Sequence, residues 1–400
     1  MTNKAIVYWA SPIEIASLRN TAKNMVTNNL VKTRLILDKI LDNINPNDKV
    51  AVKVHVGEAL NTHYLRHDYV REVVETIKSK GGIPTLVETH GRGNNYELIE
   101  ICEDYSVCIG HRRTAIDHDK IAHLHGYTES IIGAPLKFID GEKGIDGKII
   151  NIDGIQFKDV SVASGLFEFD KMVVISHFKG HPQAGFGGAL KQIGIGCVTK
   201  RNKFLAHMES AYIVKPNKCD ITKCNKECIN ACPVNAIKMN GEKALIDESK
   251  CFGCHQCVKK CPIKRAIRVP KMNEVKDFVD RFIDNFAAVL SFGAEKIRYI
   301  NFAFDITMIC DCISNPSMPV VPDLGIFGSS DPVAIDKACV DFEIKAPGLP
   351  VLNKEDEWSQ PLAPGVEKFN AMMNFVKPSL QFEAALKNNI GTTDYELIKI

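Results

Sequence analysis

The residues with the clearest chemical potential in this sequence of 400 residues are cysteines. The chain contains 14 of them, and eight fall between residues 219 and 261. They form two runs that each end in Cys-Pro: Cys219, Cys224, Cys228 and Cys232, followed by Cys251, Cys254, Cys257 and Cys261. The first residues lack the pattern of a secretory signal, so we expect a cytoplasmic chain whose thiols stay free of disulfides. Thiols crowded in this way are typical of a metal centre.

The second run has the spacing C-x2-C-x2-C-x3-C-P and resembles the run that binds a [4Fe–4S] cluster in bacterial-type two-cluster ferredoxins. In that pattern three cysteines of one run bind one cluster, and the fourth binds the other cluster. The resemblance therefore implies two [4Fe–4S] clusters, one on Cys219, Cys224, Cys228 and Cys261, the other on Cys251, Cys254, Cys257 and Cys232. The looser first run predicts a cluster that is more exposed or shifted in potential. Four-cysteine zinc sites use similar spacings, but they rarely carry Cys-Pro twice.

The charge of the chain bears on its partners. The whole chain has a net charge of +2, which gives no overall field for nucleic acid or an anionic membrane, and no run of 18 apolar residues occurs. Segment 214–270 carries 12 Lys and Arg against 5 Asp and Glu, a net charge of +7. This favours an acidic electron donor, such as a ferredoxin or flavodoxin. The same lysines would also offset the negative charge of the clusters, and the sequence leaves both interpretations open.

A second chemical centre is indicated by the stretch SHFKGHPQAGFGGALKQIGIGC, which begins at Ser176 and follows a predicted strand. Ligands of α/β sheets bind at the carboxyl ends of strands. Three glycines would let the backbone approach a ligand, and the N-terminus of the following helix favours an anion. The residues concerned are Gly185, Gly187 and Gly188, with His181 and Lys191 beside them. We therefore predict a pocket for a small anionic molecule, although a tight turn alone would also explain the glycines.

The elements that must position these residues alternate between strand and helix. A β-branched run at 50–56, a helix from His67 ended by Gly81 and Gly82, and a strand from Ile83 form a βαβ unit. Further along, Asp331 before Pro332 is typical of a helix start, and the tail over 365–400 resembles a helix. The pattern predicts an α/β fold of two parallel-sheet domains, with a small α+β ferredoxin-like domain inserted in the second. The expected boundaries are 1–160, then 161–213 with 271–400, and 214–270 for the insert.

Several longer motifs resemble the uncharacterised domain family DUF362. They are the glycine-rich stretch, VKVHVGE at 52–58, Cys310-Asp311-Cys312, and PDLGIFGSSDPVAIDKA from Pro322. Many members of that family carry a ferredoxin insert at this point of the chain. The resemblance therefore implies the architecture and the clusters, but it supplies no reaction.

The glycine-rich stretch is also distantly similar to that of nickel-pincer lactate racemases. In those enzymes a histidine precedes the turn, a lysine anchors the cofactor, a later histidine binds nickel, and another histidine shuttles protons. The matching positions are His181, Lys191, His207 and His90. The resemblance implies a racemase-like fold with a cleft at the strand ends, and an organic or nickel cofactor near Lys191 and His207. A racemase, however, has no need of two electron-transfer clusters.

We predict from these features a redox protein, an oxidoreductase of the ferredoxin-dependent reductase type. Its clusters would pass single electrons to a cofactor or small anionic substrate in a cleft built by His181, Lys191, His207 and His90. His55 and Glu58, at another strand end, are expected to line the same cleft. Two alternatives remain open: a non-catalytic electron carrier or assembly partner, and a racemase-like proton-transfer enzyme with a pocket cofactor. Cys310 and Cys312 would meet only if the chain turns between them, and otherwise are packing residues.

Overall fold

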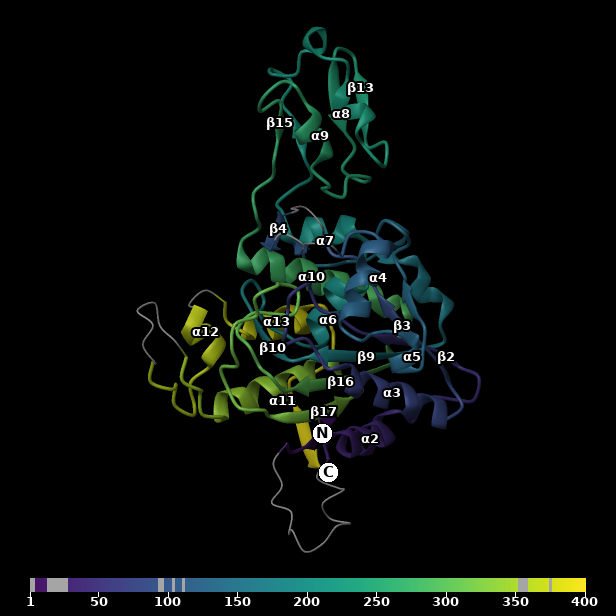
Figure 1. Cartoon of the computed structure of the whole chain (residues 1–400), viewed down its shortest axis with the longest axis vertical. Helices are drawn as coiled ribbons and strands as arrows, with labels where there is room; N and C mark the ends of the chain where they lie inside the picture. Colours follow the sequence, from purple (N-terminus) through teal and green to yellow (C-terminus); the bar gives the residue numbers. More distant parts are fainter. Residues whose placement is uncertain are drawn as a thin grey trace, which may run out of the picture.

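The computed structural model describes residues 4–12, 28–92, 97–102, 105–109, 112–351, 359–373 and 376–400. It consists of a large body and a smaller lobe that projects from it at the top of Figure 1. None of the described helices is both long and apolar enough to cross a membrane.

An eight-stranded sheet forms the centre of the body, in the order β18-β1-β17-β16-β9-β2-β3-β6. All neighbouring strands are parallel except β17, which is antiparallel to β16 and to β1. The predicted α/β fold class is therefore confirmed. The strands are β1 (Ala5–Ala10), β2 (Lys49–Lys53), β3 (Ile83–Glu88), β6 (Leu136–Phe138), β9 (Lys171–His177), β16 (Ile297–Ala303), β17 (Gly325–Ser329) and β18 (Tyr395–Lys399).

This sheet corrects two expectations about the body. Strand β2 pairs directly with β9, so the predicted boundary at residue 160 does not separate two sheets. The tail contains helices but ends in the strand β18, which pairs with β1. The first error arises because local sequence pattern predicts that a strand exists but not which strand it pairs with. The second is a missed strand, since β18 pairs with β1 at the other end of the chain and local pattern does not show that partner.

Helices cover both faces of the sheet, because its strands are apolar on both sides. Along β9, Met172 and Val174 enter one core, whereas Val173 and Ile175 enter the other. The first core is packed by α6 (Ala189–Gly196), α10 (Val275–Val289), α11 (Pro332–Lys345) and α13 (Ser379–Lys387); the second by α2 (Asn29–Ile40) and α3 (His67–Ser79). The remaining elements of the body are β4 (Glu97–Cys102), β5 (Tyr105–Ile109), α4 (Ala115–Leu124), α5 (Glu129–Ile132), β7 (Gly147–Asn151), β8 (Asp159–Ala163), β10 (Lys179–His181), β11 (Gly185–Gly187), α7 (Lys200–His207) and α12 (Lys368–Met373).

The projecting lobe contains the cysteine runs. The antiparallel pair β12 (Ile213–Val214) and β15 (Ile267–Arg268) forms its neck, so the chain leaves and re-enters the body at one place. Between these strands lie α8 (Glu227–Asn230), β13 (Ile237–Asn240), β14 (Lys243–Ile246) and α9 (Gln256–Lys260). The lobe has its own apolar core, which also takes in Phe204 of α7 and Tyr212 just before the neck.

Candidate metal centre and active-site cavity

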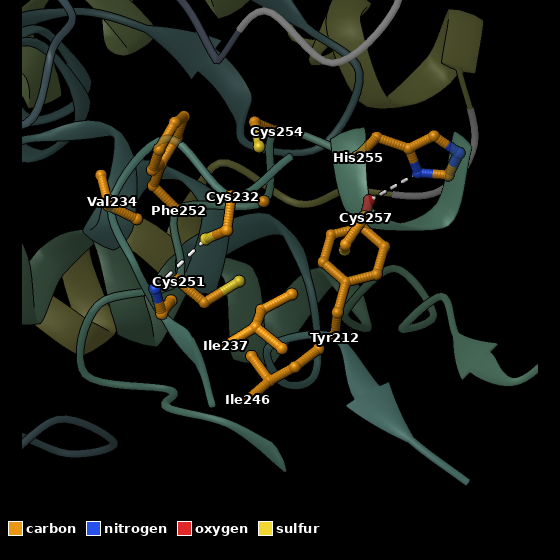
Figure 2. A pocket seen from close by; sticks show the side chains of 12 residues that line it. Tyr212, Cys232, Val234, Ile237, Ile246, Cys251, Phe252, Cys254, His255 and Cys257 are labelled. Carbon is orange, nitrogen blue, oxygen red and sulfur yellow. Dashed lines mark hydrogen bonds between the residues drawn. The ribbon is translucent and has the colours of Figure 1, made fainter. Parts of the chain in front are cut away.

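The eight cysteines of the lobe lie in two groups of four. Cys232, Cys251, Cys254 and Cys257 line one pocket together, and Figure 2 shows them with Ile237, Ile246 and the Tyr212 ring. This group contains three cysteines of the second run and the last cysteine of the first run. Cys228 lies near Cys219, Cys224 and Cys261, and burial together with these neighbours raises the pKa of its thiol. The structure thus brings together the four cysteines of each predicted set, and the sequence predicted that each set binds one cluster.

The backbone around the two runs repeats, as the sequence does. Lys226 and His255 have φ values of 61° and 66°, and each lies two residues before the third cysteine of its run. A short helix follows each of them, α8 and α9, and the two helices contact one another. In each run this residue takes the left-handed backbone conformation, which turns the chain sharply before the third cysteine.

The environment of the sulfurs fits an iron–sulfur cluster. All eight lobe cysteines are free of disulfides. Ala236 N donates to the Cys232 sulfur at 3.2 Å, and Ala244 N approaches the Cys219 sulfur at 3.5 Å. Such N–H···S contacts tune the potential of clusters held by four thiolates. Burial, with Cys251 beside it, raises the pKa of Cys257 to about 12, so binding of a metal centre must displace its proton.

A cavity of about 510 Å³ opens in the body at the carboxyl ends of the strands. His181, Lys191, His207 and His90, the four pocket residues named from the sequence, all line it, as do His55 and Glu58. They come from different elements: His90 follows β3, His181 ends β10, Lys191 lies on α6 and His207 ends α7. The fold therefore brings together residues that are far apart in the sequence, at the edge where α/β sheets bind ligands.

Lys191 supplies a positive charge to this cavity. Within the part of the chain that the structure describes, its ammonium group has no hydrogen-bond or ion-pair partner. Burial, followed by the charge of Arg112, lowers the pKa of Lys191 to about 8. The group is still mostly protonated at neutral pH, and it offers its charge to whatever occupies the cavity.

His181 and His207 line the cavity with opposite hydrogen-bonding roles, one as a donor and the other as an acceptor. The Nδ1 atom of His181 accepts from Gln183 N at 3.1 Å and Ala184 N at 3.0 Å, which leaves the ring proton on Nε2. His207 Nδ1 lies 2.7 Å from the carbonyl of Lys203 and must donate to it, so the lone pair is on Nε2, which has no partner among the residues that the structure describes. Burial, aided by Arg92, lowers the pKa of His207 to about 3. One neutral ring thus offers a donor and the other an acceptor.

His90 is placed differently from the sequence expectation of a proton shuttle. Its side chain is fully buried, and its Nε2 donates to the carbonyl of Gly141 at 2.8 Å. Its Nδ1 lies 3.2 Å from Nδ1 of His118, so both ring nitrogens are already engaged. Burial lowers the pKa of His90 to about 3. His90 therefore supports the wall of the cavity, and the carbonyl of His90 accepts from Lys203.

The N-terminus of α6 does not serve as the anion site expected from the glycine-rich turn. Ala189 N and Leu190 N donate to the carboxylate of Asp336 at 2.8 and 2.9 Å, so these amides are occupied. Gly188 is required here because a Cβ atom would overlap Asp336. The other two glycines differ in position: Gly185 packs against Pro378, whereas Gly187, like Gly188, lines a small pocket beside Lys191.

Sequence reasoning missed the buried ion pairs that surround the cavity. Lys53 Nζ lies 2.9 Å from Glu88 Oε1, and both side chains are almost fully buried. Burial alone would raise the pKa of Glu88, but Lys53 and its other neighbours lower it to about 2. A second pair joins Arg112 to Glu58 at 3.0 Å. A lysine within the mainly apolar strand run 50–56 was the signal that could have revealed the first pair.

Cys310 and Cys312 lie in a turn after β16, and their sulfurs form a disulfide. With a ring nitrogen of His181, the two sulfurs lie within 4.8 Å of one another. Cys312 lines the cavity. The sequence left open whether these residues would meet, and in the structure they do. This corrects the expectation that the thiols of the chain stay free of disulfides, because a turn between the two cysteines brings their sulfurs together.

Comparison with protein families matches residues 50–341 to the family described as "Domain of unknown function (DUF362)".

Short stretches are also similar to curated proteins. The chain is 35% identical over 79 residues to ABC transporter E family member 1 of Arabidopsis thaliana, covering 18% of this chain and 13% of that protein. It is 50% identical over 56 residues to the indolepyruvate oxidoreductase subunit IorA of Archaeoglobus fulgidus, covering 14% and 8%. It is 42% identical over 55 residues to a tetrathionate reductase subunit of the same organism, covering 14% and 25%.

Two solved structures are weakly similar to the chain. The lactate racemase apoprotein from Thermoanaerobacterium thermosaccharolyticum is 10% identical with a TM-score of 0.33, over 75% of this chain and 51% of that one. A protein from Thermotoga maritima is 11% identical with a TM-score of 0.32, over 68% and 50%. The chain thus spans about half the length of each.

Proposed function

Because this chain belongs to the DUF362 family, whose description assigns no activity, we propose a function from its site: an iron–sulfur oxidoreductase. Two [4Fe–4S] clusters held by the lobe cysteines would supply single electrons at low potential. The acceptor would be a cofactor or small anionic substrate in the cavity. The curated proteins that resemble short stretches of the chain include oxidoreductase subunits, which supports the redox part of the proposal.

The observation that carries the proposal is the position of α7 between the two centres. Phe204 of α7 is buried in the core of the lobe and stacks on Tyr212, with ring centroids 5.6 Å apart. Gly253, between the cysteines of the second run, packs directly against the Phe204 ring. Lys203 and His207, one helical turn apart on the same helix, line the cavity. The group containing Cys254 and the cavity therefore share one short helix as a common wall.

The cavity favours an enzyme over a carrier that only docks other proteins. Its volume of about 510 Å³ suits a small molecule, and a protein-docking carrier has no use for such a space. Lys191, Arg112 and Lys203 all line it, so an anionic ligand is the chemistry we propose. The arrangement of His90 argues against the racemase-like alternative, since that residue offers no free ring nitrogen for proton transfer.

Anaerobic purification and metal analysis test the proposal. We expect about eight irons and eight acid-labile sulfides per chain, and a visible absorbance that bleaches with dithionite. Small anions are then screened for those that reoxidise the reduced protein. Cys254→Ser should lose about half of the iron, whereas Cys339→Ser, which alters a buried thiol away from the lobe, should retain all of it. Zinc in place of iron would overturn the proposal.

We further propose that electrons enter from an acidic ferredoxin or flavodoxin, because segment 214–270 has a net charge of +7. The rate of reduction by such a donor should fall steeply as salt concentration rises. A rate that does not depend on salt would contradict this electrostatic attraction.

A further inference from the structure

The disulfide between Cys310 and Cys312 lies where the main cavity of the body meets a smaller pocket. Cys312 lines both the main cavity and a smaller pocket, and Lys191 lines both as well. Cys310 lines the smaller pocket and is only 6% exposed. Cys310 is therefore largely shielded from bulk solvent, whereas Cys312 is half-buried, and both line space that a ligand would fill.

The turn that carries these sulfurs is held rigidly from several sides. Asp311, between the two cysteines, forms ion pairs with Lys179 and, at 3.0 Å, with His177. Glu58 N donates to the carbonyl of Asp311 at 2.8 Å. The backbone would thus keep its position whether the sulfur–sulfur bond is open or closed. Positive charge from nearby Lys179 and Lys191 would stabilise thiolates at this place.

This disulfide is poorly suited to a structural role. A disulfide stabilises a fold mainly by restricting the unfolded chain, and its effect grows with the length of the loop it closes. Here only Asp311 separates the two cysteines. A bond that closes so short a loop adds little to the stability of the fold, and this favours a chemical role.

The same residues fit a metal site less well. Three ligands would be His181 and the two sulfurs. However, His181 Nδ1 accepts two backbone N–H groups, so the lone pair on that atom is occupied and the proton lies on Nε2. A histidine ligand needs a free lone pair, whereas a ring N–H can donate a hydrogen bond to a thiolate.

We propose that Cys310 and Cys312 form a redox-active dithiol/disulfide pair that converts single electrons into an electron pair for the cavity ligand. This inference rests on the proposed function. Opening the sulfur–sulfur bond takes two electrons, supplied singly by the reduced iron–sulfur clusters, and two protons, from the Lys191 ammonium and solvent. Two thiols result. They return both electrons and two protons to an organic anion in the cavity, and the disulfide forms again.

Timed alkylation of the intact, cluster-loaded protein tests this inference. Under anaerobic conditions the protein is reduced with methyl viologen radical, quenched with iodoacetamide and digested, and Cys310 and Cys312 are quantified by mass spectrometry. We expect both to become alkylated after the visible absorbance bleaches. In the Cys254→Ser variant labelling should slow on the order of tenfold, because the cluster next to α7 is lost and electrons reach the disulfide only from the other cluster or directly from viologen.

Two controls keep the test decisive. Cys339→Ser should label Cys310 and Cys312 at the wild-type rate, since Cys339 is buried in the main core and lines neither the main cavity nor the smaller pocket. A phosphine reductant added to every variant shows that both thiols can be labelled once the bond is open. If the clusters bleach and the disulfide persists, the inference fails while the proposed function survives. If the protein holds no iron, the proposed function fails and the inference with it. Equal labelling rates in wild-type protein and Cys254→Ser would also overturn it.

Discussion

In the proposed function, ligand binding would depend most directly on the side chain of Lys191. It stands on the first turns of α6, and its stem passes 3.8 Å from the place where a Cβ of Gly187 would be. That distance is an ordinary van der Waals contact, so a Cβ atom at position 187 would still let the lysine reach the cavity. Because burial holds the pKa of Lys191 at about 8, its charge is lost within an accessible pH range.

We expect the affinity for sulfate, whose charge is constant, to fall as pH rises through about 8. The ammonium form of Lys191 attracts the anion and the neutral amine does not, so affinity is highest below that pKa. The loss between pH 7 and 9.5 should approach about tenfold. Isothermal titration calorimetry across this range measures it.

Substitutions of Lys191 test whether this residue causes the loss of sulfate affinity. Lys191→Ala should bind sulfate weakly at every pH. Lys191→Arg should retain part of the affinity with a smaller loss near pH 8, because arginine stays charged while Lys203, which also lines the cavity and whose pKa burial lowers to about 8, still loses its charge. An affinity that is flat with pH in the wild-type protein, or unchanged in Lys191→Ala, would show that another group holds the anion.

Residue identities in the cavity could be predicted from the sequence, but their roles could not. His181, Lys191 and His207 all line the cavity as expected. The state of His90, in contrast, depends on His118 and on the carbonyl of Gly141, 28 and 51 residues further along the chain. Which ring nitrogen is free is a property of such tertiary contacts, and no local motif encodes it.

At the scale of elements, the N-terminal caps of α11 and α6 show the same limit on what local sequence can predict. Asp331 caps α11 from within its own segment, accepting from Val333 N and Ala334 N at 2.9 Å, and the sequence predicted this cap. The cap of α6 comes instead from Asp336, which is 147 residues from Ala189. Burial raises the pKa of Asp336 to about 6, although the amides of Leu190 and Ala189 oppose the shift.

We expect Asp336→Ala to lower the free energy of unfolding by about 2–4 kcal/mol, because two buried amides at the start of α6 and the Asn301 side chain lose their acceptor. Asp336→Asn should cost less, since its carbonyl oxygen can still accept. Urea unfolding measures both effects. The exposed Asp38, in α2, provides the control, and Asp38→Ala should change stability by less than about 0.5 kcal/mol. A similar small change in Asp336→Ala would mean that α6 does not depend on this cap.

At the scale of the whole molecule, the chain combines one continuous sheet with one lobe attached through a narrow neck. The pairing of Ile213 with Arg268 brings the two ends of the lobe together. The lobe has its own apolar core, but the core is completed by Phe204 from the body. Its fold should therefore depend on the metal centre and on this contact, whereas the sheet has two cores independent of it.

We expect that replacing residues 216–268 with a short linker leaves the body folded and free of iron. The deletion removes β15, but Ile213 pairs with Arg268 in the intact chain, so Lys215 and Val269 lie within reach of a linker of a few residues. The deletion uncovers Phe204, which is fully buried in the intact chain, so the shortened protein should be less soluble. Adding Phe204→Ser should restore solubility. Far-UV circular dichroism, gel filtration and thermal unfolding provide the measurement. If both shortened proteins aggregate or lose their cooperative transition, the body would depend on the lobe for its fold, and the lobe could not be a separable electron-transfer module.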